Sequence, residues 1–229
     1  MDEVERILRL LSEGKITKEE AGRLLAALEG EKAAPEPGGV LHIDAELGAV
    51  RVRRAQDGTL RASSQGRGAI DLRREGLTAW LKARGGEGLR VGPLTLGKSQ
   101  LKIDVWLPEG WGVDLRMGMG SFRADALAFL RGKLSMGEVH VDRLEGLDFH
   151  LSMGEFVAGL AVRSGRHTLR VSMGEVRLRV LPGANLRVEG GTSMGGFKGG
   201  VYGGGAAVLE VHAGMGSVHV ENGGEGAPS

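Results

Sequence analysis

The sequence contains no cysteine, which excludes disulfide bonds and cysteine-ligated metal sites. It also has no apolar run that approaches the ~18 residues of a membrane-spanning helix. Its first six residues, Met-Asp-Glu-Val-Glu-Arg, are too charged for a signal peptide. We therefore expect a cytoplasmic protein, peripheral to the inner face of the membrane if it contacts one.

Aromatic residues are scarce, at 4% of the chain, whereas glycine supplies 41 of 229 residues. This glycine content is well above the usual ~7% and does not follow the collagen triplet. A thin stack filled by aliphatic side chains needs few aromatic rings, and glycine is the natural residue for its turns. The composition therefore favours a turn-rich β architecture.

One short phrase, typically Ser-Met-Gly-Glu-Val, occurs six times. Successive methionines are 17, 17, 20, 21 and 21 residues apart, and such a period predicts a stack of similar units. The six corners are Met119-Gly120, Met136-Gly137, Met153-Gly154, Met173-Gly174, Met194-Gly195 and Met215-Gly216.

Apolar residues alternate with polar ones on both sides of each Met-Gly pair, as in half-buried strands. The glycine is typical of a bend or bulge between two strands. A single unit of this kind cannot bury its apolar face, but stacked units can. The predicted fold is mainly β, a β-solenoid over residues 40–222 with a small N-terminal α-helical hairpin. A strand near residues 218–220 is expected at its C-terminal end, where no helix covers it.

The methionines have three interpretations. We expect a buried ladder that fills the corners, because methionine is unbranched and adaptable. The first alternative is an exposed apolar contact stripe. The second, a soft-metal thioether site, is disfavoured because no cysteine is present and the histidines do not share the period.

Residues 1–30 are predicted to form two short amphipathic helices. Their apolar stripes would form an interaction face for a second copy or a protein partner, because about thirty residues cannot make a stable core alone. A Pro-containing linker, 31–39, follows, and residues 223–229 are predicted to be a disordered tail. The stripes are Val4, Ile7, Leu8 and Leu11, and Ala21, Leu24, Leu25 and Leu28.

Residues 51–90 contain ten basic and four acidic residues. One interpretation is a set of solvated strand faces. The other is a surface that contacts anionic membrane or wall polymer. Nucleic acid is not expected as a partner, because no aromatic residues interleave with the arginines. The candidate contacts are Arg51, Arg53, Arg54, Arg61, Arg73 and Arg74.

No catalytic, cofactor-binding or metal-binding constellation is predicted. Residues 92–99 match the P-loop pattern, but a strand-like run rather than a helix follows them, so we interpret them as a turn. Glu138, Glu155 and Glu175 recur beside the corners and are expected to form a solvated row, partly offset by Lys133, Arg143 and Arg163. We therefore expect neither an enzyme nor a small-molecule substrate. A carbohydrate-active β-helix enzyme is the least favoured alternative.

The segments Glu5-Arg6-Ile7-Leu8 and 14–21 (Gly-Lys-Ile-Thr-Lys-Glu-Glu-Ala) resemble the SHOCT-like N-terminal domain of LiaX-type and YvlB-type bacterial proteins. The Ser-Met-Gly-Glu-Val repeats are similar to the β-strand-repeat "putative adhesin" family that often follows such a domain. This resemblance implies a right-handed solenoid and a role in envelope stress or signalling. It provides no catalytic residues, and here methionine stands where relatives usually carry small polar residues.

The function expected from the sequence is a non-enzymatic scaffold that assembles with itself or a partner through the N-terminal hairpin. Peripheral binding of an anionic membrane or wall polymer through the 51–90 region is the alternative. The sequence does not identify the partner or the size of the assembly.

Overall fold

The computed structural model describes residues 38–66, 68–85, 89–91, 94–96 and 101–223. This part of the chain is mainly β, as predicted, and it contains strands but no helix. No helix that could cross a membrane occurs among the described residues. The predicted hairpin (1–30), most of the linker (31–39) and most of the tail (223–229) lie outside them, as does most of the P-loop match at 92–99.

Twelve strands form one sheet, and two form a separate hairpin. The long strands are β1 (Gly39–Arg54), β8 (Trp111–Leu127), β9 (Leu130–Leu144), β10 (Leu147–Leu160), β11 (Arg166–Val180) and β14 (Ala207–Asn222). The shorter ones are β2 (Arg61–Gln65), β3 (Gly68–Glu75), β4 (Thr78–Gly85), β7 (Lys102–Leu107), β12 (Leu186–Met194) and β13 (Gly200–Tyr202), and the hairpin is β5 (Leu89–Val91) and β6 (Leu94–Leu96).

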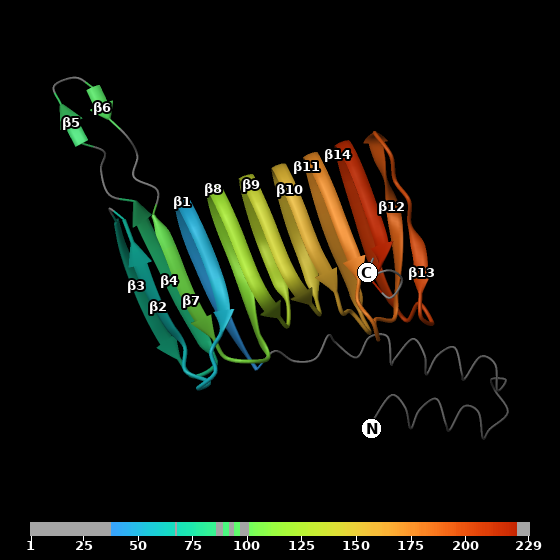
Figure 1. Ribbon diagram of the computed structural model, residues 1–229, viewed down its shortest axis with the longest axis horizontal. Helices are drawn as coiled ribbons and strands as arrows, with labels where there is room; N and C mark the ends of the chain where they lie inside the picture. The colour runs from blue at the N-terminus through green and yellow to red at the C-terminus, as the bar shows by residue number, and fades with distance from the viewer. Residues whose placement is uncertain (1–37, 67, 86–88, 92–93, 97–100, 224–229) are drawn as a thin grey trace, which may run out of the picture.

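The strands follow the order β3-β4-β1-β8-β9-β10-β11-β14-β12-β13 (Figure 1). All pairs from β4 to β12 are parallel. The last strand of the chain, β14, lies between β11 and β12 rather than at the end of the sheet. β12 covers only the first half of β14, Ala207–Met215, and the short antiparallel strand β13 forms the edge beside β12. In the second half, Val218 forms a bridge with Phe197, whereas 219–222 pair with β11 alone among the described residues. The predicted uncovered strand at 218–220 is therefore found in part, although β14 is not the last strand of the sheet.

Each long strand is bent at its central glycine. Phe149 and Phe156 both belong to β10, and seven residues of straight strand would separate them by about 23 Å. Their ring centroids are only 5.9 Å apart, so the two halves of β10 face each other. We call each bent strand a rung.

The rungs are joined by very short connections. β8 ends at Leu127 and β9 begins at Leu130, yet β9 pairs in parallel with β8 from Val113 onward. Two residues can join the end of β8 to the start of β9 only because β8 bends back on itself, which brings its end close to its own start. The sequence period of 17 is thus the length of one rung and its connection.

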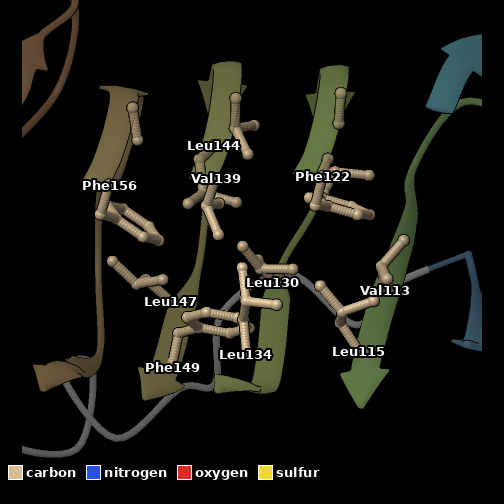
Figure 2. Close-up of a cluster of buried hydrophobic side chains, with 14 of the residues drawn as sticks. Val113, Leu115, Phe122, Leu130, Leu134, Val139, Leu144, Leu147, Phe149 and Phe156 are labelled. Carbon is tan, nitrogen blue, oxygen red and sulfur yellow. The ribbon is translucent and has the colours of Figure 1, made fainter. Parts of the chain in front are cut away.

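The core lies between the two halves of the rungs (Figure 2). Phe122, Val139 and Phe156 project from the halves after the bend, and Leu115, Leu134 and Phe149 project from the halves before it. All six are buried, and their chain neighbours alternate outward as predicted for half-buried strands. The core is one continuous aliphatic and aromatic column along the stack.

The first rungs carry a corner that the sequence analysis missed. Leu47 and Gly48 pair with Met119 and Gly120, so the segments before and after them, 40–45 and 49–54, are the halves of one rung, β1. The next rung is divided: β4 pairs with the first half of β1 and β7 with the second half. The residues between β4 and β7, including the β5–β6 hairpin, are therefore inserted at a corner (Figure 1).

Candidate interaction surfaces

The six corner methionines form an exposed row, which we call the methionine edge. They pair with one another from rung to rung, with Met215 between Met173 and Met194. Their exposed fractions are 39% to 67%. The expectation of a buried ladder was therefore wrong, and the alternative of an exposed apolar stripe is the arrangement found.

The bend explains why the methionines point outward. In β9 Leu134 and Val139 are buried, whereas Ser135, Met136 and Glu138 between them are exposed. The strict alternation fails at the corner because the backbone turns there, and the residue before the glycine lies on its convex side. Met136 lies two residues after the buried Leu134, but the two-residue alternation of buried and exposed side chains does not continue through the bend.

Glycine is required on the concave side of the corner. At Gly154 the backbone has φ 138°, and an added Cβ would lie 1.7 Å from the carbonyl oxygen of Gly137 in the next rung. The equivalent clash recurs along the corner glycines. Only a residue without a side chain lets the rungs approach to hydrogen-bonding distance here.

The glutamates beside the corners form the predicted row, but their partners differ from those expected. Arg177 lies 3.1 Å from Glu155 and 2.9 Å from Glu175, and its hydrogen bond holds the pKa of Glu175 below its usual value. Arg123 lies 3.9 Å from Glu138. Of the expected partners, Arg143 instead pairs with Glu145 at 3.1 Å, and Lys133 lies on the other half-sheet. No group of three potential metal ligands occurs among the described residues.

The six candidate arginines do not form one surface. Arg51, Arg53, Arg54 and Arg61 belong to the half-sheet after the corner, through β1 and its neighbours β7 and β2. Arg73 and Arg74 belong to β3, on the half-sheet before the corner.

Carboxylates or an aromatic ring already engage most of these six side chains. Four ion pairs join them to neighbouring acids: Arg53–Asp104 (3.2 Å), Arg54–Glu109 (2.9 Å), Arg61–Asp57 (3.0 Å) and Arg73–Asp71 (3.0 Å). The guanidinium of Arg74 lies 5.2 Å from the ring centroid of Trp111. Four of the six candidate arginines are thus already paired with carboxylates, which disfavours these side chains as contacts for an anionic polymer.

A different basic row lies on the outer face of the half-sheet before the corner, and we call it the cation row. It comprises one residue from each of five neighbouring rungs: Arg116, Lys133, His150, Arg170 and His212. All five are exposed. The row was not predicted from the sequence, because its successive members are 17 to 42 residues apart. A signal was present, since each member lies two positions before the Ser or Gly that precedes a corner methionine.

A shallow hollow of about 620 Å³ lies over the centre of the cation row. Its lining includes four permanent cations, namely Arg116, Arg131, Lys133 and Arg170, and two carboxylates, Asp114 and Asp148. The hollow therefore has a net charge of +2 with His150 neutral. No ion pair joins Arg116, Lys133 or Arg170 to a carboxylate within the described part of the chain.

One histidine is buried and has a structural environment. The backbone N–H of Leu147 donates to Nδ1 of His167 (3.2 Å), so Nε2 carries the proton and donates to the carbonyl of Ser164 (2.9 Å). Burial lowers the pKa of His167 below its usual value, although the hydrogen bond to the carbonyl of Ser164 and the charge of Asp148 oppose this effect. The neutral ring thus joins two inter-rung connections.

Comparisons with known proteins give one family match, at the N-terminus, and two structural matches that cover most of the chain. A family model described as a SHOCT-like domain matches residues 2–33. A "putative cell adhesion protein" from Clostridium sporogenes has 12% identity and a TM-score of 0.48, with coverage of 81% of this chain and 93% of its own. A "putative adhesin" from Bacteroides fragilis has 10% identity and a TM-score of 0.29, with coverage of 82% and 94%. No curated protein matches the chain.

Proposed function

We propose that this protein is a non-enzymatic interaction scaffold in which the methionine edge receives the apolar stripes of the N-terminal segment of a second copy. The exposed methionine row is the observation that carries this proposal. Six exposed methionines on neighbouring strands form an apolar line about 24 Å long. Contiguous exposed apolar surface is typical of interaction sites, and flexible thioether side chains adapt to helical partners.

We also propose that the bent parallel sheet is a β-solenoid. The two-residue connection between parallel rungs and the 5.9 Å separation of Phe149 and Phe156 both support a chain that winds around one core. A solenoid presents its corners as continuous lines, which suits a scaffold.

The tether favours a second copy as the source of the docked segment. Gly38 is fixed to the start of a rung, because its N–H donates to the carbonyl of Gly110 (2.7 Å). The corner at Leu47 is about 26 Å further along the strand, whereas the four residues between the family-matched segment and Gly38 span at most about 14 Å. The segment reaches another molecule's methionine edge more easily than the centre of its own.

Light scattering after size exclusion tests this proposal on the full chain. We expect the wild type to be multimeric and M136S/M153S/M173S to be monomeric, because the substitutions remove the apolar contact without touching the core. L8E/L25E, on the N-terminal stripes, should have the same effect. The matched control S135A/S152A/S172A changes the adjacent residues and should remain multimeric. A monomeric wild type, or a multimeric methionine variant, would refute the docking.

An envelope-linked role in the manner of LiaX-type or YvlB-type proteins is part of the same proposal. The SHOCT-like match at residues 2–33 and the resemblance of the repeats support it. We propose a cytoplasmic protein that associates peripherally with the inner face of the membrane. Fractionation of cells before and after envelope stress is the test: recovery only in the soluble fraction under both conditions would contradict this location.

A further inference from the structure

We propose that the cation row binds a linear anionic polysaccharide that lies along the stack, across the strands. This site is distinct from the methionine edge and from the arginines of residues 51–74.

The register places basic side chains at a regular spacing, three of which are permanent cations. Arg116, Lys133 and Arg170, with His150 and His212, occupy equivalent positions on five neighbouring rungs. Neighbouring strands are about 4.8 Å apart, so the row is about 19 Å long. A flexible chain with regularly placed negative groups can meet one basic residue on each rung.

The charges of the row are available to a ligand. The three permanent cations form no ion pair within the described residues, in contrast to Arg53, Arg54, Arg61 and Arg73. The 620 Å³ hollow above them contains two more cations than carboxylates. Asp114, one of those carboxylates, lies 3.4 Å from Nδ1 of His42.

The end of the row favours a sugar polymer over other polyanions. Lys82, on β4, continues the row beyond Asp44 of β1. Beside it, the Trp80 and His42 rings are stacked with centroids 6.0 Å apart and an interplanar angle of 13°. Trp80 offers a large apolar face to the C–H face of a sugar ring. Single-stranded nucleic acid would need several stacking rings along the row, and a lipid bilayer would not follow a hollow surface.

Binding of a labelled oligogalacturonate to the full chain, followed by fluorescence anisotropy at low salt, tests the proposal. R116S/K133S/R170S should weaken binding by about tenfold or more, because three direct charge contacts are lost. The matched control R51S/R123S/R179S removes the same charge from exposed positions on the other half-sheet and should bind within about twofold of the wild type. W80A should weaken glycan binding without changing the dependence of the affinity on salt concentration.

Several outcomes would overturn the proposal. An equal loss of glycan affinity in the two triple variants would mean that net charge alone attracts the glycan. Equal binding of the fully methyl-esterified, neutral glycan would exclude charge recognition. Tighter binding of oligothymidylate of equal charge, or of vesicles containing phosphatidylglycerol, would assign the row to another ligand class. The methionine variant M136S/M153S/M173S should retain glycan affinity, which separates this test from that of assembly.

Discussion

At each corner glycine, the place of a side chain is taken by the carbonyl oxygen of the neighbouring rung. Glycine at the corner is therefore required by the packing of neighbouring rungs as well as favoured by the local backbone conformation. A glycine elsewhere in the chain can be replaced if its surroundings are open, and the two situations can be compared directly.

Gly154→Ala should destabilise the fold by roughly 2–5 kcal/mol, because the new Cβ meets the oxygen of Gly137 and the backbone has positive φ. Chemical denaturation measures the change. The control is Gly191→Ala, at which an added Cβ has no neighbour within 4 Å, and its effect should be within about 0.5 kcal/mol. Equal effects of the two substitutions would show that the corner does not need glycine.

His167 should make stability depend on pH. Its pKa is lowered in the folded state, so below about pH 6.5 the unfolded chain binds a proton that the folded chain does not. The free energy of unfolding should therefore fall as the pH drops from 6.5 towards the lowered folded pKa, and this contribution should be constant above 6.5.

Urea midpoints of the wild type at pH 8 and pH 5.5, compared with those of His167→Gln, measure this contribution. The variant should lose part of the pH dependence, whereas His212→Gln, at an exposed position, should keep it. An unchanged pH dependence in His167→Gln would contradict the assignment.

At the scale of the strands, position in the sheet does not follow position in the chain. The first half of β14 pairs on both sides, with β11 and with β12, although β14 is the last strand of the chain. The short strand β13 pairs only with β12.

Hydrogen exchange should therefore be slower in the first half of β14, 207–215, than in β13 or β3, because both edges of this half are paired with neighbouring strands. Mass spectrometry of peptides covering 207–222, 200–202 and 68–75 measures the difference. Fast exchange throughout 207–222, as expected of an end strand, would contradict the observed order.

For the whole molecule, the repeat makes the stack divisible into rungs. Each rung contacts only its two neighbours, so the energetics should be close to those of a one-dimensional array. Removing one complete period should shorten the column without disturbing its register.

Deletion of residues 137–153 joins Met136 to Gly154 and retains one complete hybrid rung. We expect a folded protein with an unchanged β circular dichroism signature per residue and a lower unfolding midpoint. Deletion of 137–144 removes about half a rung, misplaces the corner and should abolish cooperative unfolding. Loss of folding in both deletions would show that the rungs are not interchangeable.

The sequence by itself determined the strands, the bend at each Met-Gly pair and the stacking period. Alternation and glycine are local signals, so they indicate strands and bends without any knowledge of which strands pair. Apolar residues on both sides of a corner, such as Leu134 and Val139, are buried as the alternation predicts. This succeeds because burial of alternate side chains is a property of the strand itself.

Only the tertiary structure decided the rest. A bend interrupts the two-residue period, so parity could not show that Met136 is exposed rather than buried. Register between rungs brings Arg116, Lys133 and Arg170 together although 54 residues separate the first from the last. The order of β14 and β12 depends on which strand edges pair, and the partners of the arginines at 51–74 depend on neighbouring strands. Each of these is a contact between distant residues, which no local pattern specifies.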